Sequence, residues 1–298
     1  MSALVSIITR TKDRPLLLPR ACDSVLAQTT TNWEHIIVND TGDPEPVEAI
    51  VSAQAARYGG RVRILHRTAS TGMESASNAG IQISTGRYLV IHDDDDSWHP
   101  QFLEKTTAYL EHQPPDSRTQ GVVCHTTRIV ENLTAAGACE TLRHPFTDGL
   151  QPLRLWRVLE ENAFPPICFL FRRSAWDALG PFDETLPVLG DWEFNVRFLR
   201  HFEIAVIPEM LAFYHHRADH SAAIYANTVT AHDHLHRATE ERLIERWAAS
   251  DAEPTLQALA SAARGARKNL ILRRENDAVR KTISTLQAHI ATIESRNT

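Results

Sequence analysis

Four consecutive carboxylates, Asp93, Asp94, Asp95 and Asp96, have the clearest capacity for chemistry in this sequence. They follow directly on an apolar run at 88–91, which predicts a strand buried on both faces. Side chains alternate along an extended chain, so Asp93 and Asp95 would point one way and Asp94 and Asp96 the other. Ionised carboxylates ~4 Å apart repel by about 1 kcal/mol in water and by more where water is excluded. We therefore expect a cation, and oxygen ligands with room for water and phosphate favour Mg²⁺ or Mn²⁺.

Another carboxylate, Asp40, ends a second strand-like run at 33–40. In an open α/β sheet, ligands bind outside the carboxyl ends of the parallel strands. Asp40 and Asp93 would then lie at the same edge of one sheet. The spacing predicts a crevice there of the size of a nucleotide.

The elements that would position these residues alternate between strand and helix patterns. Strands are predicted over 4–9, 33–40, 62–65 and 88–91, and helices over 16–28, 47–58, 72–83 and from 102 onward. Such alternation predicts an α/β fold on a mainly parallel sheet flanked by helices. Beyond residue 100 the order loosens, with strands expected at 122–130, 165–172, 204–207 and 211–214 and helices at 150–161, 174–179 and from 191. Small residues in 72–83 predict a helix packed closely on the sheet.

Composition narrows the class of protein. The chain has 298 residues and a formal net charge of −6, which does not favour wholesale binding to nucleic acid. The N-terminus lacks the basic region of a signal peptide, and no apolar stretch approaches the ~18 residues needed to cross a bilayer. Four scattered cysteines fit reduced, packed thiols. We expect a soluble, cytoplasmic protein.

The end of the chain differs in kind. Apolar residues at alternating spacings of four and three form a heptad pattern over 272–293, with the polar Asn276 at one core position. This pattern favours a parallel two-stranded coiled coil, and hence a homodimer through 270–295. A helix folded back on its own domain explains it equally well. Neighbouring basic residues could touch anionic lipid at the inner face of a membrane, although a solvated helix face explains them more simply. We divide the chain into 1–225, with halves 1–98 and 99–225, and a helical tail, 226–298.

Several motifs occur together in a familiar order. They are residues 5–15, 24–28 and 34–40, the helix start at 70–78, the acidic run at 93–98, and the pair 180–186 and 191–197. Together they resemble the family 2 glycosyltransferases of the GT-A fold, which is Rossmann-like. The resemblance spans about 4–221.

The resemblance implies roles for individual residues. Asp191 would be the catalytic general base, which deprotonates an acceptor hydroxyl. The hydroxyl would then attack the anomeric carbon from behind and invert it. Nucleotide contacts are implied for Thr9, Arg10, Asp40, Asp93 and Asp94, with the backbone around Thr9 and Arg10 lining the base pocket. Metal contacts are implied for Asp93, Asp95 and, among the histidines after the last strand, His216. The cofactor would be Mn²⁺ or Mg²⁺.

The chain also departs from the family pattern. Arg10 and Lys12 stand where Pro and an aromatic residue are usual, and Asn39 replaces the first of two aspartates. Because these changes lie beside the base pocket, the resemblance leaves the nucleotide base open. Gly190 stands where an acidic residue commonly precedes the catalytic aspartate, and Ser77 replaces a common arginine.

The leading hypothesis is a metal-dependent inverting glycosyltransferase. It would move a sugar from a nucleotide diphosphate sugar to a carbohydrate or lipid-linked acceptor, and the family suggests bacterial surface polysaccharide or glycoconjugate assembly. Two alternatives remain. A sugar nucleotidyltransferase would share the strand-end carboxylates, but it normally needs a Gly-rich phosphate loop after the first strand, and residues 10–15 contain no glycine. A non-catalytic scaffold would keep the fold and dimerise through the tail.

Overall fold

The computed structural model describes residues 4–114, 116–134, 137–147, 149–150, 152–217, 225, 227, 233–249 and 256–265. The heptad pattern at 272–293 and the proposed dimer contact lie outside these residues. Within the described ranges, no helix combines the length and hydropathy needed to span a membrane.

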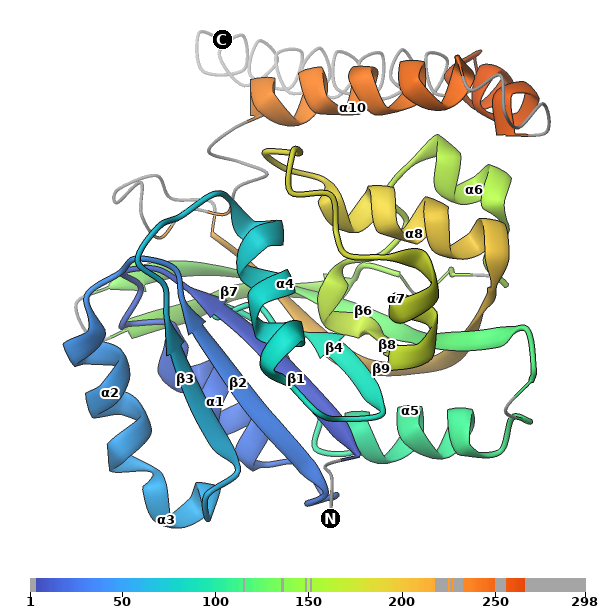
Figure 1. Cartoon of the computed structure of the whole chain (residues 1–298). Coiled ribbons are helices and arrows are strands. Elements are labelled where there is room, and N and C mark those ends of the chain that lie inside the picture. Colours follow the sequence, from blue (N-terminus) through green and yellow to red (C-terminus); the bar gives the residue numbers. More distant parts are fainter. Residues whose placement is uncertain are drawn as a thin grey trace, which may run out of the picture.

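The N-terminal half is the predicted βα alternation (Figure 1). Its strands are β1 (Val5–Thr11), β2 (Trp33–Asn39), β3 (Val62–His66) and β4 (Tyr88–Ile91), and its helices are α1 (Leu18–Leu26), α2 (Pro44–Ala53), α3 (Ala55–Tyr58) and α4 (Met73–Ile83). The four strands run parallel in the order β3-β2-β1-β4. Since β1 lies between β2 and β4, Asp40 and Asp93 follow strands that end at the same edge.

Helix α4 packs closely on this sheet, as its small residues predict. A Cβ built on Gly80 would lie 2.5 Å from Ile8 Cγ2 of β1 and 2.9 Å from Val38 Cγ2 of β2. Only a residue without a side chain allows the two backbones to approach so closely. This packing brings the first turn of α4 to the edge where β1 and β4 end.

The second half adds antiparallel pairing to the sheet. Its strands are β5 (Ser97–Trp98), β6 (Thr119–Thr134), β7 (Gly137–Pro145), β8 (Phe169–Arg172) and β9 (Glu203–Arg217). The sheet continues from β4 in the order β8-β6-β9-β5, with β7 on β6; β6 and β9 are parallel, and the remaining pairs are antiparallel. The α/β, Rossmann-like class with helices around a curled central sheet is confirmed.

Two local expectations differ from the structure. The runs 204–207 and 211–214 form one strand, β9, because its register against β6 shifts near Cys124 and His125, opposite the stretch that contains Pro208. Proline cannot donate to the ladder, so a bulge carries the strand past it. The strand expected from 165 starts only at Phe169, since Pro166–Cys168 forms a 3₁₀ turn.

Helices α5 (Phe102–Glu111), α6 (Leu155–Glu160), α7 (Arg173–Leu179) and α8 (Gly190–His201) complete this half. Helix α10 (Asp233–Ala248) lies across α8 (Figure 1). Trp247 of α10 meets Trp192 of α8 edge to face, at 5.2 Å between ring centroids. Leu243, Ile244 and Leu256 join the same hydrophobic core, so the described part of the tail packs on the domain that precedes it.

Candidate active site

The four aspartates after β4 lie among arginine side chains. Asp93 accepts hydrogen bonds from Arg10, whose Nε lies 3.1 Å from Oδ1. Asp94 accepts from Thr11 and from Arg14, each at 2.7 Å. Guanidinium groups thus balance part of the negative charge for which the sequence predicted a cation.

Asp95 is the most strongly paired of the four. Its Oδ2 accepts hydrogen bonds from Arg14 at 3.1 Å and from the buried Arg217, and Asn227 lies 3.5 Å away. Burial alone would raise the pKa of Asp95, but the charges of Arg14 and Arg217 outweigh it and lower that pKa. The sequence did not reveal Arg217, because it lies 122 residues from its partner along the chain.

Asp94 and Asp96 behave differently from Asp95. Burial raises the pKa of Asp94 to about 6 and that of Asp96 well above its usual value. Asp96 accepts a hydrogen bond from the backbone N–H of His215, at 2.9 Å. The acidic run therefore does not act as four equal ligands, and the side chain of Asp93 is the most exposed of those in salt bridges, at 26%.

A buried carboxylate on β6, that of Glu131, is linked to this cluster through Arg217. Glu131 accepts hydrogen bonds from both terminal nitrogens of Arg20, at 2.7 and 3.0 Å, and from Arg217 at 3.0 Å. His215 Nδ1 lies 2.9 Å from the same carboxylate. Arg217 thus bridges Glu131 and Asp95, and it ties β9 to the end of β4.

The carboxylates of Asp93 and Asp95 fit a divalent cation in kind. Each pairs with arginine through one oxygen, while Asp95 Oδ1 accepts no hydrogen bond from the residues that the structure describes. Mg²⁺ is commonly held by one or two carboxylates, with water and substrate phosphate completing its coordination. Among the described residues, no group of three or more His, Cys, Asp and Glu side chains is arranged to hold a metal ion.

His216 lies near this cluster in a constrained state. Its Nδ1 is 3.0 Å from an Arg128 nitrogen, and because arginine only donates, Nδ1 must accept. Burial, assisted by Arg128, lowers the pKa of His216 to about 4. The neutral ring therefore carries its proton on Nε2, so His216 can ligate a metal through that atom only when Arg128 releases Nδ1.

Asp40 lies at the end of β2, where the sequence predicted it. Arg67 donates to its Oδ1 at 2.6 Å and Ser70 to its Oδ2 at 2.5 Å. Thr9, which was expected beside the nucleotide, is fully buried, with its hydroxyl 2.8 Å from His35. Because the whole residue is 0% exposed, Thr9 presents neither its side chain nor its backbone to a ligand, contrary to the expected contact.

Asp191 lies in the first turn of α8, at a wall of a small cavity. Arg10, Glu74, Ser77 and Asn195 line the same cavity, together with apolar side chains that include Phe169 and Phe182. Asn162 donates to Asp191 Oδ2 at 2.7 Å, and burial raises the pKa of Asp191. Leu189, just before the helix, has a left-handed backbone with φ of 65°, a strain that non-glycine residues usually carry at functional sites.

Trp192, next to Asp191, belongs to the core. It is fully buried, and its indole N–H donates to Val158 O at 2.5 Å. Trp192 is therefore not available to stack on an acceptor sugar, and it packs in the core.

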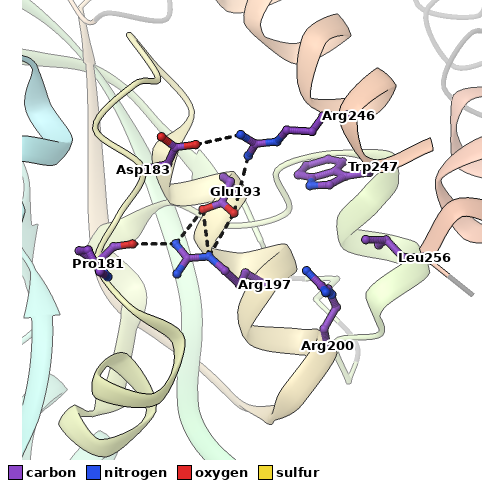
Figure 2. A pocket seen from close by; sticks show the side chains of 8 residues that line it. All are labelled: Pro181, Asp183, Glu193, Arg197, Arg200, Arg246, Trp247 and Leu256. Atoms are coloured by element: carbon purple, nitrogen blue, oxygen red, sulfur yellow. Dashed lines mark hydrogen bonds and ion pairs between the residues drawn. The ribbon is translucent and has the colours of Figure 1, made fainter. Parts of the chain in front are cut away.

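A larger cavity, of about 340 Å³, lies between α8, α10 and the loop at 181–183 (Figure 2). Its charged side chains pair with one another: Arg246 donates to Asp183 at 2.9 Å, and Arg197 donates to Glu193 at 2.8 Å. The first pair ties α10 to the loop, the second lies within α8, and Arg246 Nη2 also lies 3.7 Å from Glu193 Oε1 of α8. They lie apart from the aspartates after β4, so we assign this cavity a structural role.

Comparisons with known proteins agree with this geometry. A glycosyltransferase for PGL/p-HBAD biosynthesis from Mycobacterium bovis is 29% identical over 196 residues, covering 65% of this chain and 69% of the relative. The glycosyltransferase YwdF of Bacillus subtilis is 25% identical over 211 residues, covering 68% and 71%.

Solved structures share the fold. TarS of S. aureus in complex with UDP-GlcNAc superposes with a TM-score of 0.60 at 15% identity, covering 85% of this chain and 68% of that one. The mannosyltransferase PcManGT of Pyrobaculum calidifontis, in complex with GDP-Man and Mn²⁺, gives 0.54 at 16% identity, covering 89% and 81%. Residues 6–180, more than half of the chain, match the family described as "Glycosyl transferase family 2". The chain belongs to this family, and it is a glycosyltransferase of the GT-A type.

Proposed function

We propose that this enzyme transfers a sugar from a nucleotide diphosphate sugar to an acceptor hydroxyl, with inversion at the anomeric carbon and with the help of a divalent metal ion. One observation carries the proposal. Arg10 bonds Asp93 on the donor side and also lines the cavity of Asp191 on the acceptor side. Carboxylates from the ends of β4 and α8 therefore meet at one site, where a donor and an acceptor could react.

On the donor side, Asp40 would bind the ribose or base, and Arg10 would line the base pocket. Asp94, which Thr11 and Arg14 hold, would shape the nucleotide contact near Asp93. Asp93 and Asp95 would hold Mn²⁺ or Mg²⁺, joined by His216 only after Arg128 moves away. A bound divalent ion would stabilise the negative charge that grows on the departing diphosphate.

On the acceptor side, Asp191 would accept the proton of the attacking hydroxyl. Its raised pKa makes it a stronger base than an exposed aspartate, and Asn162 fixes its orientation. The attack from the face opposite the leaving group inverts the anomeric carbon. Covalent catalysis is not required, because one positioned base is sufficient for this displacement.

The named relatives guide the biological role. A biosynthetic glycosyltransferase among them and nucleotide-sugar complexes among the structural neighbours support surface polysaccharide or glycoconjugate assembly. The acceptor would then be a carbohydrate or a lipid-linked sugar, and the protein would work in the cytoplasm or peripherally at the inner face of the membrane. The donor base and sugar are left to experiment, since UDP and GDP sugars both occur among the neighbours.

The replacement Asp191→Asn tests the role of the base. We expect transfer to fall by about 10²- to 10⁴-fold while Mn²⁺-dependent binding of the nucleotide persists, because only proton removal is lost. Binding is measured by calorimetry with UDP and GDP, and transfer by the release of nucleoside diphosphate. Asp177→Asn, at an exposed position on α7, is the matched control. Release of pyrophosphate from a nucleoside triphosphate and a sugar 1-phosphate would instead indicate a nucleotidyltransferase, and full activity of Asp191→Asn would refute the assignment of the base.

A further inference from the structure

A second carboxylate, Glu74, lies beside Asp191 without a role in the mechanism above. Glu74 is in the first turn of α4, and its side chain rests against Gly190, the residue before Asp191. A Cβ built on Gly190 would collide with Glu74 Cγ and Cδ and would lie 2.6 Å from Oε1. Glycine at 190 therefore leaves the space that this carboxylate fills.

Gly190 is not a glycine for conformational reasons. It lies within α8 and is not among the glycines with positive φ, so other residues could adopt its backbone. The close approach of Glu74 is the physical reason that remains. Gly190 also stands where the family pattern has an acidic residue before the catalytic aspartate. The carboxylate of Glu74, from α4, fills the space beside Gly190 that a side chain on α8 would occupy.

The surroundings of Glu74 are those of a site and not of a surface helix. Its side chain is 7% exposed and lines the cavity that holds Arg10, Ser77 and Asp191. The nearest cation, Arg10 Nη1, is 3.7 Å from Oε2, too far for a hydrogen bond, and Arg10 is bonded more closely to Asp93. Apart from a hydrogen bond from the backbone N–H of Gly190, this buried carboxylate with so loose a counter-ion has unused capacity to accept hydrogen bonds.

The protonation of Glu74 agrees with this environment. Burial raises its pKa to about 7, while Arg10 opposes the rise and Asp191 adds to it. Retaining such a group costs stability, and proteins commonly carry that cost where the group serves a ligand. A neutral side chain of the same size at position 74 would fill the space without the cost of burying a charge.

We propose that Glu74 is a second carboxylate of the acceptor site, which accepts a hydrogen bond from a hydroxyl next to the one that Asp191 deprotonates. The acceptor would accordingly carry neighbouring hydroxyls, as a sugar does. This inference rests on the proposed glycosyl transfer. Glu74 orients the acceptor, and Asp191 removes the proton.

The test uses Glu74→Gln in the full-length protein, with a panel of octyl glycosides as acceptor probes and UDP and GDP sugars as donors. For the best glycoside, we expect kcat/KM for the acceptor to fall about 10- to 100-fold, the range for losing a charged hydrogen bond, with the donor KM unchanged. Glu45→Gln is the matched control, because Glu45 is also an acidic residue in the first turn of its helix but is exposed. Glu74→Asp, which keeps the charge, should retain more activity than Glu74→Gln.

A second experiment tests whether the carboxylate can act from position 190 on α8 instead of position 74 on α4. Gly190→Glu alone should inactivate the enzyme, because its side chain collides with Glu74. In Glu74→Ala with Gly190→Glu, the vacated space receives a carboxylate from α8, and we expect at least a tenfold recovery of acceptor kcat/KM over Glu74→Ala.

The outcomes separate this inference from the proposed function. An unchanged acceptor kcat/KM in Glu74→Gln, or a matching rise in the donor KM, would mean that Glu74 only balances Arg10, and it would overturn the inference while Asp191→Asn remained inactive. If wild-type protein glycosylates no probe, or if Asp191→Asn remains active, the proposed function fails first, and this inference fails with it.

Discussion

Replacing Glu131 by Gln should destabilise this protein at neutral pH and have less effect at acidic pH. Glu131 is 2% exposed and is bonded to Arg20, Arg217 and His215 beneath the aspartates. Burial would raise its pKa, but the hydrogen bonds of His215 and Arg20 outweigh burial and lower it to about 2 from the usual 4.5. The three partners therefore stabilise the charged form in the folded protein.

The magnitude follows from this difference. At about 1.4 kcal/mol for each pH unit, lowering the pKa from 4.5 to about 2 corresponds to about 3.5 kcal/mol, and screening by solvent reduces it to about 2 to 3 kcal/mol. Because the folded pKa lies below the unfolded one, this stability is fully present above pH 4.5. It is lost as the pH falls from 4.5 through about 2.

The assay is urea unfolding of both proteins, followed by far-ultraviolet circular dichroism across the range from neutral to acidic pH. The free energy of unfolding of Glu131→Gln should lie about 2 to 3 kcal/mol below wild type at neutral pH, and the two curves should converge as Glu131 protonates in the unfolded state. Glu140→Gln is the control, because Glu140 on the adjacent strand pairs with Arg143 at the surface. A deficit that stays constant down to acidic pH would refute the electrostatic reasoning and indicate a packing defect.

Three further replacements test other parts of the structure. Asp40→Asn should weaken UDP or GDP binding about 10-fold in calorimetry, because the proposed ribose contact loses its charge; unchanged affinity would contradict the donor site. Gly80→Ala should lower the free energy of unfolding by about 1 to 2 kcal/mol in urea, since the clash with Ile8 and Val38 exceeds the ~1 kcal/mol gain in helix propensity; a more stable variant would show that α4 can shift. Trp247→Ala should cost about 3 to 5 kcal/mol in the same assay, because Trp247 is buried against Trp192; no loss would mean that α10 is a separate appendage.

The sheet edge was predictable because its determinants are local. Apolar runs such as 88–91 have only one way to bury both faces, and a carboxylate after such a run must lie at the strand end. The same local reasoning failed at β9, which it divided into two strands, because a bulge in the pairing with β6 is a property of two strands and not of one. Local reasoning also did not identify what helix α10 packs against, because its Trp247 meets Trp192 only in the folded chain.

The acidic residues of the candidate site could be found in the sequence, but their arginine partners could not. A run of aspartates is evident in the sequence, whereas Arg217 reaches the Asp95 carboxylate only through β9, and Arg20 of α1 reaches the backbone oxygen of Asp95. Glu74 illustrates the same limit, since an acidic residue in the first turn of a helix is normally explained by the helix dipole. Only the collision with a side chain at Gly190 reveals its place beside Asp191.

Arginine side chains already balance the aspartates at the place where donor and metal would bind. The charge argument from the sequence demanded cations at the end of β4, and Arg10, Arg14 and Arg217 meet that demand without a ligand. A divalent ion on Asp93 and Asp95 would therefore duplicate positive charge unless an anion arrived with it. A nucleotide diphosphate supplies that anion, since guanidinium groups bind phosphate as readily as carboxylate. We therefore expect the metal and the donor to bind together, with Arg10 and Arg14 turning from the aspartates toward the diphosphate.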